Sequence, residues 1–105
     1  MSLNAFQARG LTKQIAATSA GTAAIQVCTG FQQGMFIANP STQPIYITDG
    51  TSGVQATFPT TGTPSNGLCV PAGQARGFVT DPNGWLSAAS SAGSVPFFAT
   101  PGFGQ

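Results

Sequence analysis

Short turn-forming sequences recur along this chain of 105 residues at fairly even intervals. Each combines glycine or proline with asparagine, aspartate or alanine, and such combinations favour tight turns. They are Asn39-Pro40, Asp49-Gly50, Asn66-Gly67, Pro71-Ala72-Gly73, Asp81-Pro82-Asn83-Gly84, Ala92-Gly93 and Pro101-Gly102. This spacing leaves room only for short elements, and no stretch sustains a helical period.

The segments between the turns have the alternation of β-strands. Ile45 and Ile47 fall on one face of an extended chain, whereas Tyr46 and Thr48 fall on the other. The Asp81–Gly84 turn is expected to close a hairpin. We predict at most nine strands, near residues 11–18, 22–28, 35–39, 43–48, 53–58, 67–70, 74–80, 84–88 and 94–100.

Many short strands joined by glycine and proline turns predict an all-β protein. We expect a single compact antiparallel β-sandwich with jelly-roll-like connections, formed by residues 11–100. Residues 1–10 are predicted to form a short N-terminal arm, and residues 101–105 a C-terminal tail. A chain of this length makes one domain that buries about two thirds of its extended surface.

Charged residues are scarce. They make up 5% of the chain, against roughly a quarter in ordinary domains, while a hydrophobic content of 41% favours folding over disorder. A net charge of +1 causes little repulsion between copies, so the chain tolerates close neighbours. Without a long apolar run or a secretion signal, we expect no membrane contact and synthesis in the cytoplasm.

Catalytic side chains are scarce as well. The chain has no histidine, so a serine or cysteine nucleophile lacks its usual base. Asp49 and Asp81 are the only side-chain carboxylates; a glycosidase would need them to face each other, but each precedes a turn residue and is better suited to bonding the local backbone. We therefore expect a protein that is not an enzyme and has no cofactor.

Cys28 and Cys69 are too few to complete a four-ligand zinc site in a chain without histidine. In a reducing cytosol we expect free thiols that behave as small hydrophobes. Their apolar neighbours point the other way, so both thiols could line the same secondary face, which leaves a disulfide open. Trp85 begins an alternating segment and is predicted to anchor the core rather than to stack on a sugar.

Basic residues number only three and form no patch, so we expect no nucleic-acid partner. Arg9 and Lys13 lie in or beside the N-terminal arm, where they are candidates for contacting an acidic partner surface. The alternative is that they are solvated charges that keep the arm soluble. Arg76 is predicted to be an outward strand residue.

The C-terminal sequence SVPFFATPGFGQ carries three phenylalanines and no charge. Phe97 and Phe98 must point to opposite faces of a strand, so one of them looks outward. Pro96 lacks an amide donor, which favours a sheet edge, and the later Pro-Gly pair is predicted to end the strand. We expect the outward ring of the pair, together with Phe103, to pack against a neighbouring subunit.

The layout of the chain combines a short arm, MSLNAF, a hairpin-like FIANPSTQPIYITDGTSG, a compact VPAG turn before an aromatic strand, and a closing strand that ends in TPGFG. Together these segments resemble small bacteriophage virion proteins of the capsid decoration, or cement, type. The likeness spans most of the chain and is weakest from Gln55 to Asn66.

This resemblance implies a non-enzymatic β-sandwich on the exterior of an icosahedral virion capsid, where it bridges subunits of the major capsid protein. It also implies contacts between copies, as dimers or trimers on symmetry axes. An alternative is a tail, fibre or adhesin module that recognises a host-surface carbohydrate. That alternative predicts exposed aromatic residues around a concave site, whereas a cement protein has a flatter footprint.

Overall fold

The computed structural model describes residues 7–8, 10–30, 32–80 and 83–103. These residues form β-strands and no helix, so this part of the chain holds no helix able to cross a membrane. The all-β prediction is confirmed. The strands are β1 (Gln7–Ala8), β2 (Lys13–Ala17), β3 (Ile25–Gln26), β4 (Gly34–Ala38), β5 (Ile45–Gly50), β6 (Leu68–Val70), β7 (Ala75–Val79), β8 (Trp85–Ser90) and β9 (Val95–Phe103).

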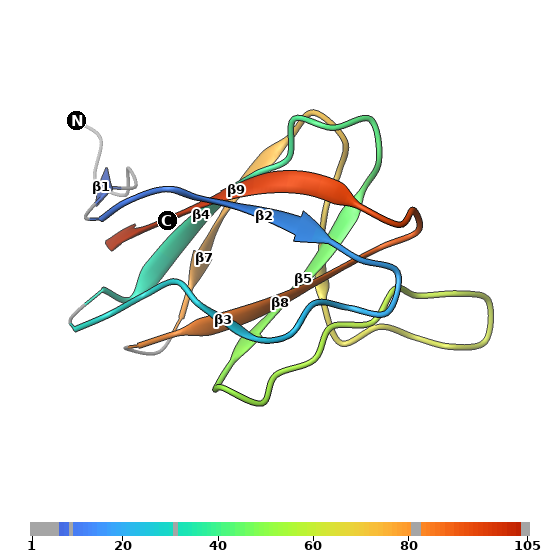
Figure 1. Ribbon diagram of the computed structural model, residues 1–105, viewed down its shortest axis with the longest axis horizontal. Coiled ribbons are helices and arrows are strands. Elements are labelled where there is room, and N and C mark those ends of the chain that lie inside the picture. The colour runs from blue at the N-terminus through green and yellow to red at the C-terminus, as the bar shows by residue number, and fades with distance from the viewer. Residues whose placement is uncertain (1–6, 9, 31, 81–82, 104–105) are drawn as a thin grey trace.

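Two antiparallel sheets pack face to face (Figure 1). The five-stranded sheet has the order β1-β9-β4-β7, and β2 also pairs with β9 on the same side as β1. The four-stranded sheet has the order β3-β8-β5-β6. The predicted β-sandwich is therefore confirmed.

The strand pairs are nested in the manner of a jelly roll. From β2 onward the first strand pairs with the last, so β2 pairs with β9, β3 with β8, β4 with β7 and β5 with β6. Pairing of β4 with β9 and of β5 with β8 joins these nested pairs into the two sheets. Every connection after β2 except that between β5 and β6 consequently crosses from one sheet to the other.

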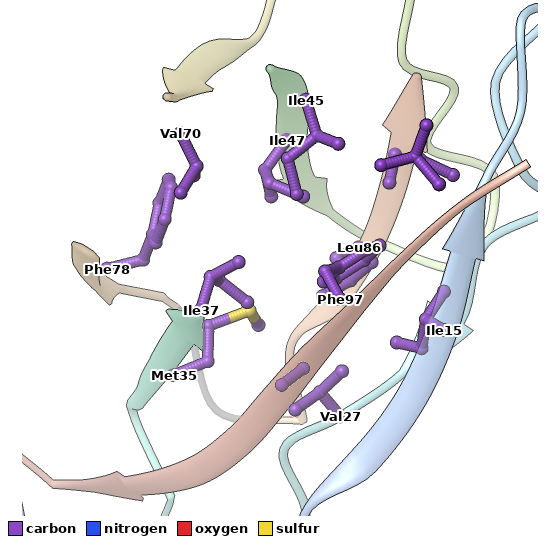
Figure 2. Close-up of a cluster of buried hydrophobic side chains, with 14 of the residues drawn as sticks. Ile15, Val27, Met35, Ile37, Ile45, Ile47, Val70, Phe78, Leu86 and Phe97 are labelled. Atoms are coloured by element: carbon purple, nitrogen blue, oxygen red, sulfur yellow. The ribbon is translucent and has the colours of Figure 1, made fainter. Parts of the chain in front are cut away.

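Apolar side chains from both sheets fill the space between them (Figure 2). Ile45 and Ile47 are buried and Tyr46 and Thr48 only partly so, which confirms the predicted alternation in β5. Phe97 of β9 is the largest fully buried side chain among the described residues. Burying a side chain of this size contributes roughly 1.5–3 kcal/mol, so this layer supplies most of the driving force for folding.

The connection between β7 and β8 is not the predicted hairpin. β7 pairs with β4, whereas β8 pairs with β3 and β5 in the other sheet, so the chain crosses the sandwich here. Asn83 adopts a left-handed backbone with a φ of 60°, and its Oδ1 accepts a hydrogen bond from the backbone N–H of Gly30 at 3.1 Å. Asp81 and Pro82, which share the turn prediction, lie outside the described residues.

Residues 53–58 do not form the predicted strand and belong to the long connection between β5 and β6. Several of their backbone groups bond to side chains and none pairs with a neighbouring strand. The N–H of Ala56 donates to Oγ of Ser87 at 2.9 Å, and the carbonyl of Gln55 accepts from Nδ2 of Asn66 at 3.2 Å. Because these bonds satisfy the backbone, the segment remains a loop despite its apolar residues.

The end of the chain also differs from the prediction. β9 continues to Phe103, so the Pro-Gly pair does not end the strand and residues 101–103 belong to the sheet rather than to a tail. Gln7 and Ala8 of the predicted arm pair with this end of β9 as β1. β9 is an interior strand, with β4 on one side and β1 and β2 on the other, and not the predicted edge strand.

Each proline of β9 lies where the described pairing of the strand is interrupted on one side. The pairing with β4 ends at Phe98 and does not reach Pro96. Pro101 lies between the end of the β2 pairing at Ala99 and the start of the β1 pairing at Gly102. A residue without an N–H is tolerated at such positions, which explains how an interior strand accommodates both prolines.

Two further residues lie elsewhere than predicted. Asp49 is an exposed residue within β5, opposite Leu86, and the turn forms after it, where the N–H of Val54 donates to the carbonyl of Thr51 at 3.0 Å. Trp85 begins β8 in the row that alternates with buried Leu86, so it is half-buried on the outer side of its sheet instead of anchoring the core.

Candidate interaction surface

Among the described residues, the outer face of the five-stranded sheet is apolar and carries no charge. Alternate residues of each strand point away from the core, and the strand register aligns them in rows across β2, β9, β4 and β7. We call the exposed and partly exposed members of these rows the open face: Gln14, Ala16, Phe36, Ala38, Ala75, Gly77, Val79, Pro96, Phe98 and Thr100. Its polar side chains are one amide and one hydroxyl, so the surface offers mainly hydrocarbon.

Two phenylalanines provide the largest side chains of the open face. Phe98 is 38% exposed and Phe36 is 36% exposed. Phe36 lies opposite Thr100 and Phe98 lies opposite Ala38, so the two residues occupy diagonal positions on adjacent strands. The Cα atoms of such diagonal neighbours typically lie about 7–8 Å apart, within reach of aromatic side chains. On β7 the same two rows carry only Gly77 and Ala75, so β7 contributes no large side chain to these rows.

The outer face of the four-stranded sheet is covered by the chain itself. Residues 51–67, the long connection between β5 and β6 (yellow-green in Figure 1), fold against it. Phe58 packs edge-on against Tyr46, with ring centroids 5.2 Å apart and an interplanar angle of 85°. Ser87 is fully buried where its Oγ accepts the N–H of Ala56 at 2.9 Å. Of the two outer faces, the open face therefore exposes more side-chain surface among the described residues.

The described charged residues lie away from the open face. Lys13 falls in the inward-facing row of β2, opposite Ala99, yet it is exposed at the sheet margin. Arg76 of edge strand β7 is opposite buried Ile37, so it also belongs to an inward row and is not the predicted outward residue. An inward charge on an edge strand discourages edge-to-edge pairing, which leaves the face as the better contact surface.

The predicted interface residues divide into separate groups. Phe98 lies on the open face, whereas Phe97 is fully buried and has no surface to offer a partner. The outward ring of the pair is thus Phe98. Lys13 is exposed beside a pocket described below. Arg9 and the side chain of Phe103 lie outside the described part of the structure.

Phe36 is the candidate residue that the sequence reasoning missed. It stands between Met35 and Ile37, which are both fully buried, so strand alternation directs it outward. A large aromatic residue at an outward strand position was the available signal.

A pocket of about 430 Å³ opens at one margin of the sandwich, beside β2 and β3. No aromatic residue is among its described lining residues, and Lys13 is its one charged group. The lining residues are Gly10, Leu11, Lys13, Ile25, Gln26, Val27, Thr29, Gln32 and Pro101.

The two cysteines are free thiols in different parts of the fold. Cys69 lies on β6, opposite Tyr46, in the row that alternates with buried Val70, whereas Cys28 is fully buried in the core. They therefore do not line one face as predicted. The N–H groups of Val27 and Cys28 both donate to the carbonyl of Gly84, at 3.0 and 3.1 Å, and this bulge-like pairing allows both side chains to turn inward.

Among the described residues, Tyr46 has a pKa that the fold clearly shifts. Burial raises the pKa of its hydroxyl above the ordinary value, and the charge and hydrogen bonding of neighbouring Cys69 raise it further. The described residues contain no group of three or more His, Cys, Asp or Glu side chains arranged to hold a metal ion.

No family model matches the chain, and no curated protein matches its sequence. Among solved structures, the fold is similar to Streptomyces albus HEPD with substrate 2-hydroxyethylphosphonate (2-HEP) and Fe(II) bound. The TM-score is 0.53 at 13% identity, and the match covers 95% of this chain and 21% of that chain. This chain thus spans about a fifth of the length of that enzyme, and the likeness is one of fold.

This similarity corrects the expectation that the chain is not an enzyme, because HEPD, in which a similar fold occurs, is an enzyme with substrate and Fe(II) bound. The residues of this chain do not fit such an iron centre. Non-haem Fe(II) oxygenases commonly hold the metal with two histidines and one carboxylate, and this chain contains no histidine. The space between the sheets is also filled by apolar side chains.

Proposed function

We propose that this chain is a bacteriophage capsid decoration, or cement, protein. It binds the exterior of the virion head and bridges neighbouring major capsid protein subunits, thereby stabilising the shell. The observation that carries the proposal is the open face, a sheet surface that carries no charge among the described residues and exposes two phenylalanines. The jelly-roll fold occurs in viral capsid proteins, lectins and cupins alike, so the surface and not the fold carries the argument.

The composition of the open face suits a protein contact. Interface centres are depleted in charge and enriched in aromatic residues, as this face is. Covering the exposed third of Phe36 and of Phe98 contributes roughly 0.5–1 kcal/mol each. That is modest for one copy, but a shell presents many identical sites and adjacent copies support one another.

The low charge of the chain suits the same role. With a net charge of +1, neighbouring copies on a lattice repel each other only weakly. The copies can therefore also contact one another as dimers or trimers around symmetry axes, as expected for capsid-bound proteins with closed symmetry.

The alternative of a carbohydrate-binding tail, fibre or adhesin module has less support. It requires aromatic rings around a concave site. The exposed rings Phe36 and Phe98 lie on a sheet face, and the described lining of the pocket contains no aromatic residue. A broad footprint on another protein accounts better for where the rings are.

The proposal is tested with heads of the phage that encodes the chain, after this protein has been removed. Cryo-electron microscopy after adding it back should locate it on the outer surface, between capsid subunits. Heads that bind none of the wild-type protein would refute the decoration role.

A Phe36→Ser/Phe98→Ser double variant tests the contact surface. It should bind with fewer copies per head, because it removes both exposed rings of the open face. Leu68→Ser is the matched control, since Leu68 is 53% exposed on the other sheet and its loss should leave binding unchanged. Equal binding by all three proteins would place the contact elsewhere.

A further inference from the structure

The pocket beside β2 and β3 has the size and lining of a small-molecule site. Its volume of about 430 Å³ lies within the roughly 300–1,000 Å³ that is typical of ligand pockets. It is formed where Gly10, Leu11 and Lys13 approach Ile25–Val27, Thr29, Gln32 and Pro101. Apolar walls with a few polar groups are the usual makeup of such sites, because the walls supply affinity and the polar groups fix orientation.

Lys13 determines which ligand charge the pocket favours. Its row on β2 continues into Ile15 and Ala17, which are buried in the core, so its side chain lies on the inner side of the sheet at the open margin of the sandwich. In the part of the chain that the structure describes, Lys13 makes no ion pair and no side-chain hydrogen bond. An ammonium group without a partner beside apolar walls favours an anion there.

The walls require a ligand with hydrocarbon as well as charge. Leu11 is 86% exposed at the pocket, and Ile25, Val27 and Pro101 supply further apolar lining. Covering an exposed leucine is favourable for any apolar group that fits against it. Phosphate recognition generally recruits several cationic or backbone donors, whereas one ammonium suits a single carboxylate.

We propose that this pocket binds a carboxylate attached to an apolar body, with the carboxylate at Lys13 and the hydrocarbon against Leu11 and Ile25. The site is separate from the open face, and its occupation does not depend on the proposed capsid role.

The experiment uses octanoate as the probe and the full-length, ¹⁵N-labelled chain. Titration should give saturable shifts of the backbone amides of Gln26, Val27 and Gln32, which line the pocket. Octanol and octylammonium share the hydrocarbon but not the negative charge. Their affinity should be lower than that of octanoate by a factor of about ten or more, the change expected from losing one modest charge interaction. No shift with octanoate, or equal affinity for octanol, overturns the proposal.

Substitutions at two exposed residues of the pocket test the contribution of charge and that of hydrocarbon to binding, and a third, outside the pocket, is the control. None of them alters the core. Lys13→Gln should weaken octanoate about tenfold and bring it to the level of octanol, whereas Arg76→Gln, which removes a cation outside the pocket, should change nothing. Leu11→Ser should weaken octanoate and octanol alike. Octanoate affinity that is the same in the wild type and in Lys13→Gln would show that Lys13 does not receive the carboxylate.

Discussion

Phe97 and Phe98 are consecutive residues of β9 with opposite environments. Phe97 has no exposed surface and lies between the sheets, as Figure 2 shows, whereas Phe98 is 38% exposed on the open face. The pleat of a strand that is buried on one side only produces this division. Of these two neighbours, Phe97 therefore stabilises the core of the sandwich, whereas Phe98 is placed to contact a partner.

The two rings should respond differently to removal. Phe97→Ala creates a cavity in the core and should lower the free energy of unfolding by about 3–5 kcal/mol. Phe98→Ser removes a ring that is already partly in water and should cost about 1 kcal/mol or less. Urea unfolding followed by circular dichroism compares them, and equal losses would contradict the assignment of faces.

Tyr46 is the only tyrosine of the chain, so its ionisation can be followed directly by phenolate absorbance. Its pKa should lie above the ordinary value of about 10, because burial disfavours the charged form. Since the folded state holds this proton more tightly than the unfolded state, the associated stability is present below pH of about 10 and is lost as the pH rises through the folded pKa.

Substitution of Cys69 tests the causes of this shift. Cys69→Ala should lower the pKa of Tyr46 only part of the way, because burial is the larger cause and remains in place. A return to the ordinary value would mean that the thiol, and not burial, dominates.

Two glycines with the same left-handed backbone provide a matched pair. Gly21 has a φ of +86° and Gly62 a φ of +82°. A Cβ at Gly21 would clash with the carbonyl oxygen of Ala56, whereas one at Gly62 would meet nothing within 4 Å. Gly62→Ala should therefore cost only the backbone strain of about 1–2 kcal/mol, and Gly21→Ala clearly more.

Urea midpoints of these two variants provide the comparison. A larger loss at Gly21 would support the close packing of the β2–β3 connection against the residue 51–67 loop. Similar losses at both positions would contradict that packing.

Sequence patterns correctly predicted those features that depend on local backbone geometry. The alternation of Ile45 and Ile47 with Tyr46, and the opposite faces of Phe97 and Phe98, follow from the two-residue period of a strand. The existence of most strands followed from turn residues that need no knowledge of distant segments.

The predictions were wrong where the structure depends on contacts between segments that are far apart in the sequence. The residues after β7 have good turn chemistry, but whether the next strand pairs with β7 depends on the nested pairing of the whole jelly roll. Residues 53–58 look like a strand, yet Ser87 and Asn66 satisfy their backbone as a loop. The pocket likewise depends on β2, β3 and Pro101 meeting in space.

Removal of residues 101–105 tests the revised end of β9. Pro101 and Gly102 are buried and pair with Met35 and Gly34 of β4, and Gly102 also pairs with Ala8 of β1. Truncation should therefore unpair β1 and uncover the end of β4. With several backbone hydrogen bonds lost at about 0.5–1.5 kcal/mol each, the urea midpoint should fall and the amide of Ala8 should lose its protection from hydrogen exchange.

Full-length Phe98→Ser is the control, because it alters the open face but keeps these strand pairs. If the truncated chain proves as stable as the full-length protein, residues 101–103 do not contribute to the sheet in solution, and weaker head binding by the truncated chain would then report a contact made by the tail itself.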